Sequence, residues 1–273
     1  MSATRHIALP DGTALNIRID GAEGAPWVVL SNSVMTDLTV WDDTAAALAP
    51  RFRVLRYDQR GHGQSDVTAG PLAFADYGAD LSALMDTLGI ARAVLVGLSM
   101  GVPSCLAAHA LRPDRTAAFV AVDGVARSAP GREAFWTERR ETARAGGMAA
   151  IAAGTAERWL PGTAADSPLR RRLEAMIAAT PVEGFAAATH ALAAYDLSAV
   201  LPSLAGRPVL GIAGAEDGAI PAAVAAQFGA LPGARTATIA GAGHLPNFQA
   251  PAAFADALTG FLDQAAVTTK ETD

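Results

Sequence analysis

Three residues far apart in the sequence, Ser99, Asp217 and His244, have the types needed for nucleophilic catalysis. Ser99 lies at the centre of residues 97–101, which read GLSMG and have the form Gly-x-Ser-x-Gly. A serine hydroxyl is a weak nucleophile until a base removes its proton, and we assign that role to His244. Asp217 would hold the imidazole in the required tautomer and stabilise its cation. Together they predict hydrolysis of a carboxylic ester or lactone through an acyl-serine intermediate.

The segment around Ser99 predicts a strand, a sharp turn and a helix. Residues 93–98 are an apolar run, and residues 101–111 have the composition of a helix. The serine between them would occupy a strained turn and project into a cleft. Gly97 and Gly101 carry no side chain, so the strand and the helix can approach each other closely on both sides of the serine.

Asp217 and His244 each follow a predicted strand, at the end where ligands bind in open parallel sheets. The strand at 208–213 runs into the loop that holds Asp217. The last strand, at 235–240, runs into the loop that holds His244. The nucleophile, the base and the acid therefore share one kind of position, at the carboxyl end of a strand.

Two other acidic residues compete with Asp217 for the role of the acid. Asp123 also follows a predicted strand, at 117–122, and is the second choice, while Glu216 is a poorer one. Asp217 is preferred because its loop comes after a long helical segment and directly precedes the strand and loop of His244.

The oxyanion formed by attack on a carbonyl needs two backbone N–H donors. We assign one to Met100, directly after the nucleophile and at the amino end of a helix. The second should come from the loop after the buried strand at 27–30, and the amide of Val34 is the best placed.

Predicted strands and helices alternate along the chain, which indicates an α/β protein whose sheet is mostly parallel. A hairpin around Asp11-Gly12 should form one edge of the sheet. We expect eight strands flanked by helices. The strands are predicted at 6–10, 14–20, 27–30, 52–57, 93–98, 117–122, 208–213 and 235–240, the helices at 44–48, 74–88, 101–111, 221–228 and 251–262, and a frayed tail at 267–273.

The pattern changes between residues 126 and 203, where strand-like runs are absent and alanines and Arg/Glu pairs are frequent. We interpret 126–203 as a helical cap inserted in the core. The hydrolase-like core would then consist of residues 1–125 and 204–273.

Composition excludes several classes of function. Hydrophobic residues make up 51% of the 273 residues and charged residues 18%, which excludes a disordered chain and suits a sheet covered on both faces. The net charge of −6 argues against a nucleic-acid partner, which needs clustered Lys and Arg. No apolar run approaches about eighteen residues and no signal-peptide pattern is present, so we expect no membrane contact and a cytoplasmic location.

No metal or cofactor is expected. No histidine pair has metal-ligand spacing, and no phosphate-binding glycine loop precedes a Lys-Ser/Thr pair. Cys105 is the only cysteine, so an intrachain disulfide is impossible. His62 lies in the polar loop 58–66, which we expect to be tied together by side-chain to backbone bonds, and it is interpreted as structural.

Together these residues resemble the α/β-hydrolase superfamily over nearly the whole chain, including its order of serine, acid and histidine. Within it, the chain is similar to the 3-oxoadipate enol-lactonase branch. The resemblance implies an α/β-hydrolase fold and cofactor-free hydrolysis of a small lactone acid. The motifs that carry it are Ser31-Asn32-Ser33 followed by Thr36-Asp37 and Trp41, the stretch 55–66, the pentapeptide 97–101 and the stretch 243–247.

Two departures from that branch indicate a reshaped pocket. Val34-Met35 replaces the usual Leu-Gly, and Val102 replaces a second glycine after the pentapeptide. Met35 is therefore expected to line the pocket, with Trp136 or Trp159 on its apolar side. A carboxylated substrate would also need an arginine, and we assign Arg132, with Arg139, Arg140 and Arg144 as the other candidates of the cap.

Two further functions remain open from the sequence. Perhydrolase or haloperoxidase relatives use the same three residues for peroxide chemistry. A binding protein could keep the fold and bind a small molecule without catalysis. The expected partner in either case is a small molecule, and the sequence does not indicate an oligomeric state.

Overall fold

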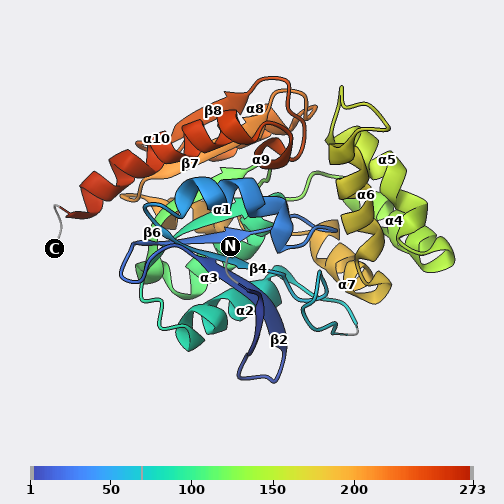
Figure 1. Ribbon diagram of the computed structural model, residues 1–273, viewed down its shortest axis with the longest axis horizontal. Coiled ribbons are helices and arrows are strands. Elements are labelled where there is room, and N and C mark those ends of the chain that lie inside the picture. Colours follow the sequence, from blue (N-terminus) through green and yellow to red (C-terminus); the bar gives the residue numbers. More distant parts are fainter. Residues whose placement is uncertain (1–2, 69, 271–273) are drawn as a thin grey trace.

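The computed structural model describes residues 3–68 and 70–270, with the side chains of 266–270 left out. Over these residues it forms an eight-stranded sheet in the order β1-β2-β4-β3-β5-β6-β7-β8 (Figure 1). Strand β2 pairs antiparallel with β1 and β4, and all the other pairs are parallel, which confirms the predicted mostly parallel sheet. The strands are β1 (Arg5–Ala8), β2 (Ala14–Asp20), β3 (Trp27–Ser31), β4 (Arg53–Tyr57), β5 (Ala93–Leu98), β6 (Thr116–Val122), β7 (Val209–Gly214) and β8 (Arg235–Ile239).

Helices cover both faces of the sheet, as a parallel sheet requires. Along β3, the side chains of Val28 and Leu30 join the core on the face of α1 and α10, whereas Val29 joins the core on the face of α2 and α3. Figure 1 shows these two pairs of helices on opposite sides of the strands. The helices outside the insertion described below are α1 (Asp42–Leu48), α2 (Phe74–Thr87), α3 (Gly101–Leu111), α8 (Ile220–Gln227), α9 (Pro246–Gln249) and α10 (Pro251–Lys270), with 3-10 turns η1 (Leu38–Trp41), η2 (Pro113–Arg115) and η3 (Ser198–Leu204).

The last helix is longer than predicted. Helix α10 continues to Lys270, whereas the sequence placed its end at residue 262 and a frayed tail at 267–273. Alanines 265 and 266 favour helix and extend it. Residues 271–273 of the predicted tail lie outside the described residues.

Four helices stand between β6 and β7 in the chain, and we call them the helical insertion. They are α4 (Arg132–Gly146), α5 (Ala149–Trp159), α6 (Pro168–Ala179) and α7 (Val182–Ala193). They gather to one side of the sheet, coloured yellow-green to gold in Figure 1. The predicted helical character of this segment is thus observed, while the division into a core and a separate cap at 126–203 stays a prediction.

A pair of glycines joins the helical insertion to the core. Gly61, in the loop after β4, has a left-handed φ of 80°. A side chain on Gly184 of α7 would place its Cβ 2.0 Å from the carbonyl oxygen of Gly61. Only glycine at both positions allows this approach of backbone to backbone.

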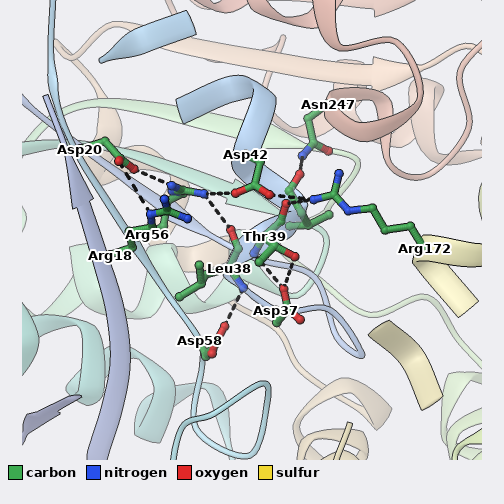
Figure 2. Close-up of polar contacts among 11 residues, drawn as sticks. Arg18, Asp20, Asp37, Leu38, Thr39, Asp42, Arg56, Asp58, Arg172 and Asn247 are labelled. Atoms are coloured by element: carbon green, nitrogen blue, oxygen red, sulfur yellow. Dashed lines mark hydrogen bonds and ion pairs between the residues drawn. The ribbon is translucent and has the colours of Figure 1, made fainter. Parts of the chain in front are cut away.

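A buried arginine links the sheet to its neighbours. The Arg56 side chain of β4 is fully buried and forms ion pairs with Asp20 of β2 and Asp42 of α1 (Figure 2). Asp42 also accepts a hydrogen bond from Arg172 of α6 at 2.8 Å, and Arg172 donates a second one to the carbonyl of Thr39. This network connects two strands, the first helix and the helical insertion.

We expect Arg56→Met to lower the free energy of unfolding by about 3 kcal/mol, because removing the cation from a buried ion pair leaves the carboxylates uncompensated. Equilibrium unfolding in urea measures this. Arg51→Met is the matched control, since Arg51 and its partner Asp263 are both half exposed and a surface pair contributes little. Equal effects of the two substitutions would contradict the structural role of Arg56.

Candidate active site

Ser99 lies in the strained turn that the sequence predicts between β5 and α3. Its φ is 53°, in the left-handed region, and its N–H donates to the carbonyl of Val122 at 2.8 Å. A Cβ on Gly101 would lie 2.2 Å from the carbonyl oxygen of Ser31, and one on Gly97 would lie 2.4 Å from that of Gly101. The glycines are therefore needed for the close approach of strand and helix around the serine.

Ser99, His244 and Asp217 form a continuous hydrogen-bonded chain. His244 Nε2 lies 2.8 Å from Ser99 Oγ, and His244 Nδ1 lies 2.6 Å from Asp217 Oδ2. The side chains of His244 and Asp217 are only 13% and 15% exposed, which strengthens their interaction. The structure thus brings together the three residues that the sequence predicts, from the loops after β5, β7 and β8.

The imidazole of His244 is held by the end of α5. The backbone N–H of His244 donates to the carbonyl of Trp159 at 3.0 Å. The indole ring of Trp159 lies against the imidazole, with 4.9 Å between the ring centroids. The helical insertion therefore contributes to the orientation of a histidine that belongs to the loop after β8.

Two backbone N–H groups beside Ser99 have no acceptor. Val34 and Met100 both line the same cavity as Ser99. Within the described part of the chain, neither backbone N–H donates a hydrogen bond. Buried N–H groups normally have a partner, so these two amides can receive an oxygen of a bound molecule.

The loop that holds Val34 is fixed at its far end. The N–H of Leu38 donates to Asp58 Oδ1 at 2.6 Å, and Asn247 Nδ2 donates to the carbonyl of Val40 at 2.9 Å (Figure 2). Asn247 lies in α9, three residues after His244. The hydrogen bond from Asn247 therefore fixes the loop after β3 relative to the loop after β8, which carries His244.

Met35 has a backbone conformation that is unfavourable for its side chain. Its φ is 60°, and the side chain is fully buried while lining the cavity. A methionine in the left-handed region costs about 1–3 kcal/mol, whereas glycine adopts this conformation freely. Met35 therefore lines the cavity at the expense of local strain.

Asp123, the second candidate for the acid, has a different place from Asp217. The residue is 1% exposed, and its carboxyl accepts the N–H of Gly214 at 3.0 Å. Burial, and then the charge of Asp217, raise the pKa of Asp123 well above its usual value. Asp123 therefore ionises less readily than an exposed carboxyl, and it lies beside an acid that contacts His244. Glu216, the third candidate, is exposed, and among the described residues the imidazole of His244 bonds to Asp217 and Ser99 and not to it.

The hydrogen-bonded chain opens into a cavity of about 340 Å³ between the core and the helical insertion. The core contributes Ser99 and His244. The three residues that the sequence predicts for the pocket all line it: Met35, Arg132 and Trp136. Trp159, the alternative to Trp136, lines it too. Lining residues that the sequence did not indicate include Phe135, Arg158 and Tyr195.

The other arginines considered for the pocket lie elsewhere. Arg139 donates to Thr155, Arg140 to Thr189, and Arg144 pairs with Glu183 on the outer side of the insertion. Of the four predicted arginines, Arg132 is the one that lines the cavity. No sequence signal marks Arg158, because its place in the cavity depends on how α5 packs against α4.

His62 is structural, as expected. Its ring is fully buried, Nδ1 lies 3.2 Å from the carbonyl oxygen of Arg60, and burial lowers its pKa to about 4. Asp58 ties the same loop together by accepting the N–H of Gln64 at 2.9 Å.

Among the described residues, no group of three or more His, Cys, Asp or Glu side chains could hold a metal ion. No helix in the described part of the chain is long and apolar enough to cross a membrane.

The chain resembles known proteins over almost its full length. Residues 24–257 match the alpha/beta hydrolase family. The chain is 34% identical to 3-oxoadipate enol-lactonase 1 of Acinetobacter baylyi over 253 residues, 92% of this chain and 94% of the relative. The enol-lactonase structure from Burkholderia xenovorans matches with a TM-score of 0.88 and 36% identity, covering 95% of this chain and all of the other.

A hydrolase from Pseudomonas aeruginosa is equally similar in structure. Its TM-score is also 0.88, with 37% identity over 95% of this chain and 98% of that one. These similarities confirm the predicted relation to the enol-lactonase branch and the predicted fold class.

Asp123→Asn tests whether Asp123 is neutral in the folded protein. A carboxyl whose folded pKa is raised adds stability that is complete below its unfolded pKa, about 3.9, and is lost as the pH rises towards the folded pKa. The amide does not titrate, so the wild type should lose free energy of unfolding relative to the variant between about pH 5 and about pH 8.

Urea unfolding at the two pH values measures this difference. Asp123→Ala is the comparison, because it leaves the buried N–H of Gly214 without an acceptor and should cost about 1–3 kcal/mol at either pH. If the free energy of unfolding depends on pH equally in the wild type and in Asp123→Asn, then Asp123 is ionised in the folded protein.

Proposed function

We propose that this chain, which belongs to the alpha/beta hydrolase family, hydrolyses a small carboxylic ester or lactone through an acyl-Ser99 intermediate. The observation that carries the proposal is the hydrogen-bonded chain from Asp217 through His244 to Ser99, facing a cavity. Fold and relatives support an ester or lactone hydrolase, and the roles of individual residues are inferred from their geometry.

In the proposed first step, His244 Nε2 takes the proton of Ser99 as Oγ attacks the substrate carbonyl carbon. Asp217 fixes the tautomer and stabilises the imidazolium. The carbonyl oxygen becomes negative and accepts hydrogen bonds from the free N–H groups of Val34 and Met100. Because these N–H groups are already in position, they stabilise the transition state more than the ground state.

The intermediate then breaks its bond to the leaving oxygen, which receives the proton from His244. In a lactone the leaving oxygen stays attached to the acyl group, so the ring opens without release of a fragment. A water molecule, deprotonated by His244, attacks the acyl carbon, and the bond to Ser99 Oγ breaks as the serine regains its proton. The steps use only the side chains and amides of this site.

The cavity supports a small substrate. Its volume of about 340 Å³ is at the lower end of small-molecule sites, which begin at about 300 Å³. Relatives named as 3-oxoadipate enol-lactonases support a lactone acid of that size. We also propose that residues 126–203 act as a cap over the cavity, because α4 and α5 supply one of its walls.

Ser99→Ala should abolish turnover of 4-nitrophenyl acetate, lowering kcat at least about 1,000-fold because the nucleophile and its acyl intermediate are lost. The variant should fold normally, and urea unfolding checks this. Ser82→Ala on α2, outside the cavity, is the matched control and should retain activity. A fluorophosphonate probe should label the wild type and not Ser99→Ala; an unlabelled wild type would favour the alternative of a binding protein.

Asp217→Asn should lower kcat about 1,000- to 10,000-fold, because an amide cannot hold the imidazole in the required tautomer or stabilise its cation. The neighbouring substitution Glu216→Gln is the matched control, since Glu216 is exposed and the imidazole of His244 bonds to Asp217 instead. Steady-state kinetics with the same ester measures both. Similar losses in the two variants would show that the acid has been assigned incorrectly.

A further inference from the structure

We propose that Gln59 and Ser104 are positioning residues that hold the amides of Val34 and Met100 in the arrangement that receives an oxyanion. The inference rests on the proposed function, because it concerns the backbone donors that would stabilise the negative oxygen. Neither Gln59 nor Ser104 lines the cavity, so both would act through the backbone that they contact.

The side chain of Gln59 joins the two segments of backbone that carry these donors. Its Nε2 donates to the carbonyl of Asn32 at 2.6 Å, two residues before Val34. Its Oε1 accepts a hydrogen bond from the hydroxyl of Ser104 at 2.7 Å. The backbone N–H of Ser104 donates to the carbonyl of Met100 at 3.3 Å, and its Oγ lies 3.0 Å from the same carbonyl oxygen. A polar bridge therefore runs from one donor segment to the other.

The chemistry of the neighbouring groups fixes the orientation of the Gln59 amide. A carbonyl oxygen can only accept, so the NH2 group must face Asn32. The oxygen of the amide then faces Ser104, whose hydroxyl supplies the proton. Turning the amide around would bring two oxygens together at Asn32. The bridge thus has one arrangement of donors and acceptors, and each side-chain polar atom of both residues has a partner.

The bridge is shielded from water. Gln59 is almost fully buried and Ser104 is fully buried. Hydrogen bonds in a poorly hydrated region are strengthened and cannot be exchanged for bonds to water. Burying an amide side chain is unfavourable unless its hydrogen bonds are made, whereas an apolar side chain of similar size has no such requirement. The position is therefore one where geometry, and not apolar packing, accounts for the glutamine.

Each end of the bridge lies close to a donor. Met100 has a helical φ of −55° and ψ of −30°, so fixing its carbonyl also fixes the direction of its N–H. At the other end, Asn32 Nδ2 donates to the carbonyl of Thr36 at 2.5 Å, and the Thr36 hydroxyl donates to the carbonyl of Ser33 at 2.8 Å. Because these bonds tie the loop to itself, the contact at Asn32 also sets the place of Val34.

The bridge matters because two donors on different elements must reach one oxygen. Val34 follows β3 and Met100 follows β5, and these strands are neighbours in the sheet. A donor stabilises an oxyanion when it lies about 2.7–3.1 Å from that oxygen, so a small change in the separation of the two amides weakens the contacts. The neutral carbonyl of a bound ester depends on them less, so the loss falls mainly on the transition state.

Gln59→Leu removes both hydrogen bonds of the amide and should lower kcat/KM for 4-nitrophenyl acetate about 10- to 100-fold, less than the loss of a whole donor would. Ser104→Ala should have a similar effect. The double variant should be no worse than the more impaired single variant, because both residues belong to one bridge. Thr116→Val is the matched control: it removes a buried hydrogen bond to His109, in the last turn of α3, and should retain activity.

A second measurement distinguishes positioning of the donors from general support of the fold. The ketone 1,1,1-trifluoropentan-2-one can form an anionic adduct with Ser99 that resembles the transition state, and 1,1,1-trifluoropentan-2-ol cannot. In Gln59→Leu the inhibition constant of the ketone should rise about 10- to 100-fold, as kcat/KM falls, while that of the alcohol should change less than about twofold. The midpoint of the pH profile of kcat/KM should stay that of the wild type, because the bridge does not contact His244 or Asp217.

Variants that keep the kcat/KM and the ketone inhibition of the wild type would overturn this inference and leave the proposed function intact. Equal weakening of inhibition by the ketone and the alcohol would also overturn it, because the bridge would then support only the shape of the cavity. A wild type that the ketone does not inhibit would contradict both the acyl-Ser99 mechanism and this inference. Urea unfolding checks that Gln59→Leu is folded, and Ser104→Ala, which removes a single hydroxyl, decides if it is not.

Discussion

The left-handed backbone of Ser99 is the constraint on which the site depends. A non-glycine residue in this conformation costs about 1–3 kcal/mol, and the surrounding packing must hold it. A Cβ on Gly124 would come within 2.6 Å of the Ser99 carbonyl oxygen, nearly as close as the approaches at Gly97 and Gly101. Three glycines thus surround one strained serine, and the resulting turn directs Oγ towards His244 and exposes the amide of Met100 to the cavity.

Two neighbouring carboxyl groups have different surroundings in this site. Asp217 contacts the imidazole and remains partly accessible, whereas Asp123 lies almost fully buried at the end of the adjacent strand. Two negative charges in contact would repel each other strongly in this poorly hydrated region. The raised pKa of Asp123 favours its neutral form, which reduces that repulsion.

The sequence was sufficient to predict the parts of the site that depend on strands. Ser99, Asp217 and His244 each follow an apolar strand, and the carboxyl ends of parallel strands meet at one edge of a sheet. The choice of Asp217 over Asp123 was predicted from loop order, and its geometry agrees with that choice. The sequence also predicts Met35 and Trp136 in the pocket, and both line the cavity.

The parts formed by packing between helices could not be predicted in the same way. Arg158 reaches the cavity because α5 lies against α4, and alanine-rich helices have no residue pattern that specifies how they pack. The strained backbone of Met35 and the raised pKa of Asp123 likewise depend on the conformation and burial that only the folded chain determines.

The contact between Gly61 and Gly184 links the shape of the cavity to the orientation of the base. It fixes α7 against the core, and α7 packs in turn on α4, whose residues line the cavity. Helix α4 contacts α5, and the carbonyl of Trp159 at the end of α5 accepts the backbone N–H of His244. A side chain at either glycine would therefore displace a wall of the cavity and also disturb the support of His244.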